Sequence, residues 1–378
     1  MKILFPIGTF YPATVGGPNL SVYWLTKELK KHGIEPIVVT TDFGIKREHN
    51  IEFNKWINTE YGRVIYVKEK KHALPLKSVS FIKKLVNKEK IDIVHLTSIF
   101  YPLSLGSYLV SKSFVNSIVW SPRGELLKGA VDKGKKSLKK VYIYTIKKFL
   151  NENVVFHSTS KSETESIRKY FPKSKVVEIK NFISLNNRLN TEVKKQILYL
   201  GRLHPKKNIE SLIKALKLSK EFKKNKFKLI IAGTGDNSYK EFLVKEVKKL
   251  NLENFVSFVG HIEGLRKDKL IAESKCLILP SHSENFGMVV VEALSQGTPV
   301  IASKYTPWEE LEKYDAGYWI EPKPEFLANA LDDIILKEEG EYIKMRKNAY
   351  KLAENYDISK NISKWIDFYY SIVGKRHG

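Results

Sequence analysis

The chain has 378 residues, which is more than one hydrophobic core usually organises, so two domains of similar size are expected. Lys and Arg outnumber Asp and Glu by 65 to 41, giving a net charge of +24 that favours a polyanionic partner; a general lysine bias is the alternative explanation. The single cysteine, Cys276, excludes an internal disulfide, and no apolar run approaches the roughly 18 residues that span a bilayer. We therefore expect a soluble, cytoplasmic protein.

Short β-branched strands alternate with amphipathic helices along the whole chain. The expected strands are residues 2–7, 36–41, 92–96, 117–121 and 153–158 in the first half, and 196–201, 228–233, 255–260, 276–281 and 299–303 in the second. Because the strands are apolar on both faces, helices must cover both sides of parallel sheets. The pattern restarts near residue 195. It predicts two doubly wound α/β domains, residues 1–185 and 195–358, with a ligand at the carboxyl ends of the strands, between the domains.

A last helix is expected over residues 359–378. It places Ile362, Trp365, Ile366 and Tyr369 on one face. Such an apolar stripe needs a surface to cover. We expect it to pack back on the N-terminal domain, and a membrane surface is the alternative.

The loop after the first strand contains Gly16 and Gly17, followed by Pro18 at the first position of a helix that Gly33 ends. It is not a dinucleotide-binding fingerprint, because it has no G-x-G-x-x-G pattern. The glycine pair either lets the backbone approach a ligand or forms a simple turn.

Three polar residues stand at or just after the ends of strands in the first half. His95 and His157 either line a substrate site or are satisfied structural histidines. Arg123, in the loop WSPRGELL, either faces a ligand or caps a helix. Ser160 and Glu163 have the spacing of a capping box.

A basic segment with interleaved aromatic residues follows, over residues 128–150. It either rests on an anionic membrane or presents an ordinary solvated helix face. Its lysines are Lys135, Lys136, Lys139, Lys140, Lys147 and Lys148.

The second half opens with the strand and loop LYLGRLHPKKN. Arg202 and Lys207 lie at the carboxyl end of this strand, where cations suit a phosphate group, and Asn208 has the position of a helix N-cap. A lysine-rich surface turn is the alternative. Gly233 and the pair His261 and Ile262 close two later strands, where ordinary turns explain them nearly as well.

The segment from Ser281 to Ser303 contains two glutamates eight positions apart. Glu284 lies in the loop after a buried strand, and Glu292 lies inside an apolar helix that Gly297 ends. A buried carboxylate costs several kcal/mol unless it is hydrogen-bonded or paired, so Glu292 needs donors. Ribose hydroxyls would supply them, and the free N–H groups from Asn285 to Met288 suit a diphosphate. The alternative is a salt-bridged core glutamate beside an unrelated surface one.

The string SENFGMVVVEALSQGTPVIAS closely resembles the E-x7-E segment of the retaining, nucleotide-sugar-dependent glycosyltransferases of family 4, whose two-domain fold is called GT-B. The string GRLHPKKN is similar to the G-R-x(4)-K-N segment of the same family. The resemblance implies two Rossmann-like domains facing each other across a cleft.

The resemblance also implies roles for particular residues. Glu284, Arg123, Arg202 and Lys207 would act at the reaction centre, with Glu284 orienting the donor sugar and Glu292 holding ribose. Many family members have a histidine where Arg123 stands, so this position departs from the pattern. His95, Arg123 and His157 are the acceptor-side candidates. The implied donor-binding set is Gly16, Gly17, Arg202, Lys207, Gly233, His261, Ile262, Glu284, Asn285, Phe286, Gly287, Met288 and Glu292.

The implied reaction moves a sugar from a UDP-, GDP- or other nucleoside diphosphate sugar to a hydroxyl of a saccharide or lipid-linked acceptor, with retention of configuration. Surface polysaccharide biosynthesis, of the lipopolysaccharide or capsule type, is the implied setting, with the chain peripheral to the inner face of the cell membrane. No cofactor and no metal are expected, and the absence of a D-x-D pattern agrees with this.

Two rival functions stay open. A nucleotide-sugar epimerase or a glycogen-synthase-like enzyme would use the same architecture. A basic nucleic-acid-binding protein would explain the charge, but no helix-turn-helix, zinc-finger or RNA-binding sheet signature is present, so we expect no nucleic acid partner.

Overall fold

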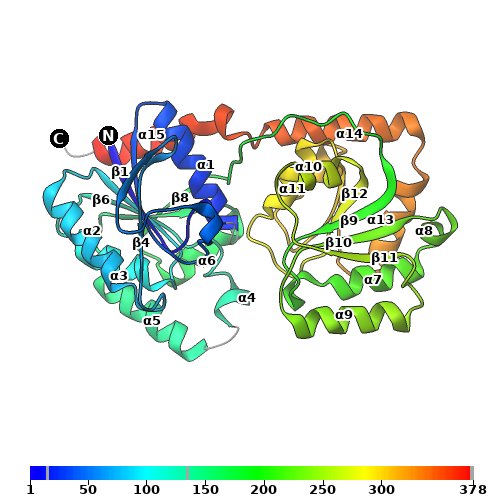
Figure 1. The fold of residues 1–378 in the computed structure, drawn as a ribbon, viewed down its shortest axis with the longest axis horizontal. Helices are drawn as coiled ribbons and strands as arrows, with labels where there is room; N and C mark the ends of the chain where they lie inside the picture. The colour runs from blue at the N-terminus through cyan, green and yellow to red at the C-terminus, as the bar shows by residue number, and fades with distance from the viewer. Residues whose placement is uncertain (14–16, 133–135, 375–378) are drawn as a thin grey trace. The chain divides into compact units, whose positions relative to one another are not determined.

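A computed structural model describes residues 1–13, 17–132 and 136–374. They form two units (Figure 1): unit 1 comprises Met1–Ser184 and Ile358–Gly378, and unit 2 comprises Leu185–Asp357. Each unit has a central, mainly parallel sheet between layers of helices, so the predicted doubly wound α/β class is confirmed.

The described residues of unit 1 form an eight-stranded sheet in the order β3-β4-β2-β1-β5-β6-β7-β8, parallel except for the β3–β4 pair. Every position of β5 and β6 is buried, which requires cover on both faces. The strands are β1 (Lys2–Ile7), β2 (Glu35–Thr41), β3 (Trp56–Thr59), β4 (Gly62–Val67), β5 (Ile93–Thr97), β6 (Ser117–Ser121), β7 (Val154–Ser158) and β8 (Lys175–Glu178).

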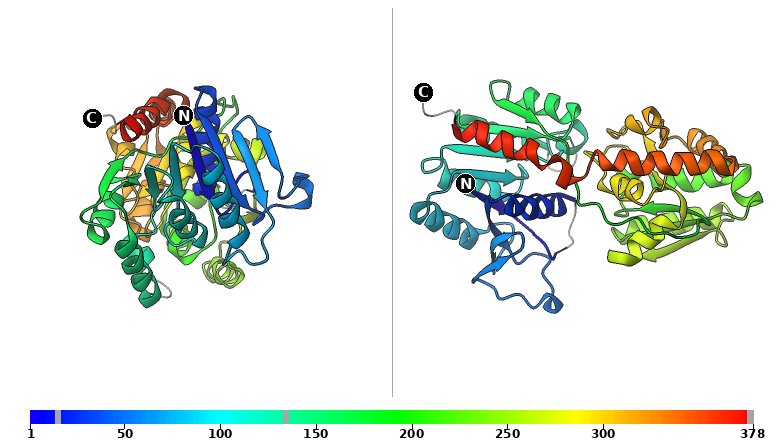
Figure 2. Two further views of the ribbon diagram at one scale, coloured as in Figure 1. Left: turned by 90° about the vertical axis from the view of Figure 1, so that its left-hand side faces the viewer. Right: turned by 90° about the horizontal axis from the view of Figure 1, so that it is seen from above.

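Two apolar clusters cover the two faces of this sheet. One joins the strands to α2, α3, α5 and α6, and the other joins them to α1 and α15. Figure 2 shows α15 returning to lie along unit 1 near α1. The helices are α1 (Gly17–Lys31), η1 (Arg47–His49), α2 (Leu76–Lys88), α3 (Pro102–Ser111), α4 (Lys128–Val131), α5 (Lys136–Phe149), α6 (Lys161–Tyr170) and α15 (Ile358–Val373).

Unit 2 contains a sheet of six described strands in the order β11-β10-β9-β12-β13-β14, all parallel. The strands are β9 (Lys194–Leu200), β10 (Lys228–Ala232), β11 (Val256–Gly260), β12 (Ser274–Leu279), β13 (Val300–Ser303) and β14 (Gly317–Ile320). The helices are η2 (Pro205–Lys207), α7 (Ile209–Leu218), α8 (Glu221–Lys224), α9 (Asn237–Lys249), α10 (Gly264–Ala272), α11 (Met288–Ser295), α12 (Glu310–Lys313), α13 (Pro324–Leu336) and α14 (Glu339–Glu354).

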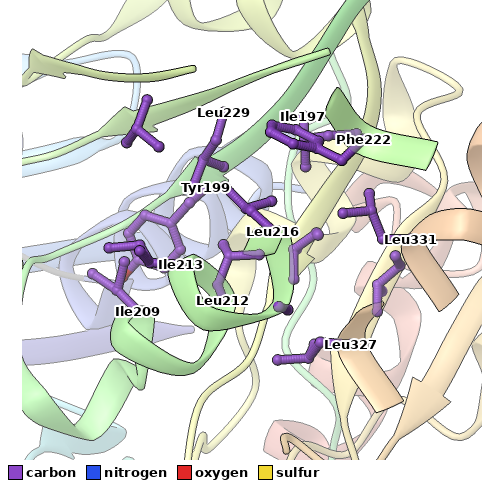
Figure 3. Packing of buried hydrophobic residues seen from close by; sticks show 14 of the residues in the cluster. Ile197, Tyr199, Ile209, Leu212, Ile213, Leu216, Phe222, Leu229, Leu327 and Leu331 are labelled. Carbon is purple, nitrogen blue, oxygen red and sulfur yellow. The ribbon is translucent and has the colours of Figure 1, made fainter. Parts of the chain in front are cut away.

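The core of unit 2 forms where α7 and α13 pack on the sheet. Figure 3 shows Leu212 and Leu216 of α7 beside Leu327 and Leu331 of α13, under strand residues such as Tyr199. Positions 209, 212, 213 and 216 share one side of α7, so the helical period in the sequence determines this packing. Among the described residues, no helix combines the length and apolarity needed to cross a membrane.

Four strands lie outside the predicted set: β3, β4, β8 and β14. Three of them, β3, β8 and β14, are only four residues long, and each lies at an edge of its sheet. A strand this short is determined by the neighbour that pairs with it, because its own sequence carries little periodicity. The segment after Ser184, expected to be a connection, belongs to unit 2, where Leu189 N donates to Gln296 Oε1 at 2.9 Å.

Candidate functional site

The carboxyl ends of β9 and β12 lie side by side in the unit 2 sheet, and the chain leaves them in opposite directions. The helix after β9, α7, packs on α13, whereas the helix after β12, α11, packs on α14. This is the topological switch point of a doubly wound sheet, where ligands bind in such folds. Two hydrogen bonds join the loops there: His282 N donates to Lys206 O at 2.9 Å, and Asn208 Nδ2 donates to Pro280 O at 3.1 Å.

Lys207 and Glu284 meet at this switch point as an ion pair. The lysine side chain is 20% exposed and the glutamate side chain is 17% exposed, so both charges are largely removed from water yet reachable. The residues are far apart in the chain, and the loop geometry brings them together. The structure therefore places the predicted phosphate-facing cation directly against the predicted sugar-facing carboxylate.

Glu292 lies in the second turn of α11 and forms an ion pair with Lys267 of α10, with 2.9 Å between Oε1 and Nζ. Its side chain is 15% exposed. The expectation that a ligand alone would supply its partners is wrong, because a lysine of the same unit already donates to it. Lys267 was missed by the sequence analysis. Its only signal was a lysine on the helix GLRKDKLIA, which precedes the strand before Glu284.

The loop from Ser281 to Gly287 is held by aromatic contacts and turns at a glycine. Trp308 Nε1 donates to Phe286 O, and the Phe286 and Trp308 rings lie 5.2 Å apart. Gly287 has φ of 81°, a left-handed conformation that a side chain would strain, and it leads directly into Met288 at the start of α11. The N-terminal end of α11 is thus presented at the same sheet edge.

Two buried oxygen atoms beside this loop, Ser281 Oγ and Asn285 Oδ1, have no hydrogen-bond partner within the described residues. An unsatisfied buried polar atom costs about 1–3 kcal/mol. A ligand or water that donates hydrogen bonds here would recover that energy.

The other predicted residues of the second half lie at the same carboxyl edge, with different environments. Arg202 is exposed at the end of β9. Position 233 requires glycine, because a Cβ there would come within 1.9 Å of Gly201 O. His261 is exposed and lies 3.2 Å from a Glu263 carboxylate oxygen, and Ile262 follows it in the loop after β11.

Asn208 does not cap α7 with its side chain. It occupies the N-cap position with φ of 56°, but its amide donates to Pro280 O and Pro322 O. The predicted capping role is therefore wrong. The side chain instead joins the loop after β9 to the loops after β12 and β14, which stabilises the switch point.

Two family models together cover most of the chain. Residues 183–352 match the model described as "Glycosyl transferases group 1", and residues 15–187 match "Glycosyltransferase Family 4". The chain is a glycosyltransferase of the GT-B type.

Relatives and solved structures agree with this family. An uncharacterised glycosyltransferase of Methanocaldococcus jannaschii is 27% identical over 366 residues, covering 89% of each chain. Sucrose-phosphate synthase from Thermosynechococcus elongatus has a similar structure, with a TM-score of 0.81 at 19% identity over 99% of each chain. Anabaena HepE, solved with UDP and glucose, has a TM-score of 0.74 at 18% identity, covering 97% of this chain and 99% of its own.

In unit 1 of this glycosyltransferase, His95 and His157 belong to one buried hydrogen-bond chain. His157 Nε2 donates to Ile179 O at 2.8 Å, because a carbonyl only accepts. Its Nδ1 then accepts from Ser121 Oγ at 2.8 Å, and Ser121 Oγ accepts from His95 Nε2 at 2.7 Å. The other nitrogen of His95 accepts from the Tyr369 hydroxyl at 2.7 Å. One set of neutral tautomers therefore satisfies both rings.

The hydrogen bonds and burial of the two histidines contradict the interpretation that they line an acceptor site. His95 and His157 are at most 1% exposed, and Trp365 of α15 packs against both rings. Burial lowers the pKa of His157 to about 3 and places the pKa of His95 well below its ordinary value. Both residues are structural, and neither presents an atom to an acceptor.

Arg123 stands in a left-handed turn, with φ of 56°, just after β6. Its Nη1 donates to Asn181 Oδ1 at 2.6 Å, and its Nε is buried without a hydrogen-bond partner in the described residues. The next residue, Gly124, donates its N–H to Glu163, which also accepts from Thr159 N at 2.8 Å. Ser160 Oγ accepts from Glu163 N, so half of the predicted capping box forms. The Glu163 carboxylate accepts from Thr159 N rather than from Ser160 N, and it fastens the Arg123 loop to the start of α6.

Some predicted positions of this glycosyltransferase, Gly16 and Lys135, lie outside the described residues. Gly17 is the first described residue of α1. Lys139 donates to Ala130 O at 2.6 Å, whereas Lys140, Lys147 and Lys148 are exposed on α5, the helix that also contains Lys136. Within the described ranges, no three His, Cys, Asp or Glu side chains gather closely enough to hold a metal ion.

Proposed function

We propose that this glycosyltransferase moves a sugar from a nucleoside diphosphate sugar to a hydroxyl of a saccharide or lipid-linked acceptor, with retention at the anomeric carbon and without a metal. The observation that supports this best is the Lys207–Glu284 pair at the switch point of unit 2. A phosphate-binding cation and a hydroxyl-binding carboxylate are adjacent there, which matches the two chemical halves of a sugar nucleotide.

Donor binding would exchange the partners of this pair. The diphosphate offers Lys207 two adjacent phosphates in place of one carboxylate, with Arg202 nearby on the same loop. Glu284 is then released to accept hydrogen bonds from sugar hydroxyls. After the exchange both charged groups still have hydrogen-bond partners, and the ion pair compensates them before the donor binds.

The N-terminal end of α11 would complete the diphosphate site, because its free N–H groups and the helix dipole favour an anion. Glu292, one turn further along, would accept from ribose hydroxyls while Lys267 stays paired with its Oε1. We place the nucleobase near Gly233, His261 and Ile262, at the ends of β10 and β11.

In the transfer step, the bond from the anomeric carbon to the diphosphate oxygen breaks, and a bond from the acceptor oxygen forms on the same face. The acceptor proton passes to the departing phosphate oxygen. The charges of Arg202 and Lys207, with the α11 N-terminus, would stabilise the leaving diphosphate in the role that a metal ion has elsewhere. Arg123 is the acceptor-side candidate of unit 1.

A lipid-linked acceptor would require the chain to approach a membrane, and α5 offers a suitable face. Leu138, Val141 and Tyr144 are 62%, 62% and 70% exposed. The exposed Lys140, Lys147 and Lys148 lie on the same helix. Apolar side chains among lysines favour an anionic lipid surface. The setting that we propose is surface polysaccharide synthesis at the inner face of the cell membrane.

The experiment is a transfer assay with UDP- and GDP-sugars and a panel of saccharide acceptors, after treatment with a chelator. A product with the anomeric configuration of the donor, formed at an unchanged rate after chelation, is expected. An inverted product would contradict retention, and a chelator-sensitive rate would contradict metal independence. Free sugar and diphosphate formed with equal efficiency when no acceptor is present would support the epimerase instead.

A further inference from the structure

A pocket lies in unit 2 at the amino edge of its sheet, away from the switch point. It has a volume of about 390 Å³, which suits a small molecule. Three cations line it, Arg188, Arg346 and Lys347, beside two carboxylates and three less polar side chains: Glu192, Glu339, Val193, Tyr342 and Ile343. Glu192 and Val193 stand immediately before β9. Because the strands of this sheet are all parallel, residues preceding β9 lie at the opposite edge from Lys207 and Glu284.

Arg346 is a buried cation whose positive charge has few hydrogen-bond acceptors and no paired carboxylate among the described residues. It is 7% exposed, and its guanidinium donates to Gln296 O at a long 3.4 Å. Throughout the described residues, no carboxylate forms an ion pair with Arg346 or with Arg188. A buried charge without a counter-ion costs several kcal/mol, so the arrangement favours binding of an anion.

More positive charge surrounds the pocket. The Arg188 guanidinium packs against Gly297, where a Cβ would lie 3.0 Å from its Cζ. Lys275 Nζ lies 3.5 Å from the centroid of the Tyr342 ring, and the Arg346 guanidinium lies 6.0 Å from the same centroid. Arg188 is exposed overall, but partial desolvation of its guanidinium and the neighbouring Arg346 charge hold the pKa of Arg188 below its usual value.

The C-terminal end of α11 explains part of this arrangement. Gln296, whose carbonyl accepts from Arg346, is the C-cap of that helix. A helix C-terminus is equivalent to only about half a negative charge, whereas two guanidinium groups carry two full positive charges. Glu192 and Glu339 also line the pocket, but within the described residues neither forms an ion pair with Arg188 or Arg346, so helix capping leaves both guanidinium groups without a paired carboxylate.

We propose that this pocket binds a small phosphate ester. Two guanidinium groups and the Lys347 ammonium suit the several acceptor oxygens of a phosphate. The Tyr342 ring and the apolar Val193 give the attached carbon skeleton a surface to pack on. The bound ester would contact the C-terminal end of α11, the helix that carries Glu292. This site is separate from the proposed donor site and does not depend on it.

The test measures binding of inorganic phosphate and of glycerol 3-phosphate to the full chain, by calorimetry at constant ionic strength. Both are expected to saturate, with glycerol 3-phosphate the tighter ligand. Arg188→Gln and Arg346→Gln should each weaken binding at least roughly tenfold. Arg188 is exposed, so its variant keeps the test decisive if Arg346→Gln does not fold.

Two further variants separate this pocket from the donor site. Lys207→Ala should leave glycerol 3-phosphate affinity unchanged within roughly twofold, and so should Arg47→Gln, a control at an exposed arginine of unit 1. The proposal is overturned if the wild-type chain shows no saturable binding, or if Arg188→Gln binds normally. It is also overturned if Lys207→Ala abolishes binding, because the phosphate would then occupy the donor site.

Discussion

Both units have polar residues at or near the ends of their parallel strands, but the two histidines of unit 1 are buried whereas the charged pair of unit 2 is reachable. In unit 1, His95, Ser121 and His157 form a closed hydrogen-bond chain with every ring nitrogen satisfied. In unit 2, Lys207 and Glu284 are reachable, and nearby Ser281 Oγ and Asn285 Oδ1 have no hydrogen-bond partner in the part of the chain that the structure describes. A polar residue at a strand end is therefore a site candidate only where its side chain is reachable and can still bind a ligand.

The cause of the difference is one helix. In unit 1, α15 returns from residue 358 and contributes Tyr369 and Trp365 to the histidine cluster. In unit 2, the loops after β9 and β12 are joined by the backbone bond from His282 N to Lys206 O and by the Asn208 side chain, and their charged side chains stay at the edge. Four predictions test this comparison.

The largest expected effect is on the stability of unit 1. Trp365→Ala should lower the free energy of unfolding by about 3–5 kcal/mol, because a large side chain that packs on both histidines is lost from the core. Urea unfolding followed by circular dichroism measures this. The control Tyr370→Ala, at an exposed position of the same helix, should change stability by less than about 0.5 kcal/mol. Equal effects of the two variants would contradict the covering role of α15.

The second prediction concerns pH. The pKa of His157 falls to about 3 in the folded chain, and that of His95 is also lowered, so both stay neutral while the unfolded chain protonates them near pH 6.5. The unfolded state then binds more protons, and the free energy of unfolding should fall as pH decreases from about 6.5 towards 3. The maximum slope is about 1.4 kcal/mol per pH unit for each histidine.

The free energy of unfolding of the wild type and of His157→Gln, measured between pH 7 and pH 5, gives this slope. The variant should have a smaller slope, because it lacks the contribution of one histidine. His261→Gln, at an exposed histidine, should keep the full slope. A wild-type slope in His157→Gln would show that the ring is not held neutral.

The third prediction concerns the unit 2 ion pair. Lys207→Ala should weaken UDP binding roughly tenfold to a hundredfold, the expected loss for a charged hydrogen bond to phosphate. Calorimetric titration measures it, with Lys214→Ala as the control at an exposed lysine of α7. UDP affinity equal to that of the control would remove Lys207 from the proposed donor site.

The smallest expected effect is at Glu292. Glu292→Gln should weaken UDP binding by roughly tenfold or less, because the amide keeps one acceptor for ribose. The free energy of unfolding should fall by about 1–2 kcal/mol, because the pair with Lys267 is largely removed from water and the amide gives the lysine a neutral acceptor in place of a carboxylate. A double-mutant cycle with Lys267→Ala separates the two roles. If both single variants lose stability but bind UDP normally, the pair is purely structural.

Much of the fold follows from local pattern. Apolar strands and amphipathic helices such as α7 are predictable because their burial is visible in their own periodicity. The short edge strands β8 and β14 are not, because their pairing depends on a neighbour. Lys267 was missed for a related reason: a lysine on a helix has no local signal that it faces a carboxylate 25 positions away.

The sequence by itself determined the alternation of strands and helices, the restart of the pattern near residue 195, and the chemistry available at the loops after β9 and β12. Only the tertiary structure decided which charges meet and which are covered. It paired Lys207 with Glu284 and Lys267 with Glu292, and it enclosed His95 and His157 beneath α15. The physical reason is that periodicity reports the burial of a residue in its own element, whereas the partner of a charge depends on contacts between elements distant in the chain.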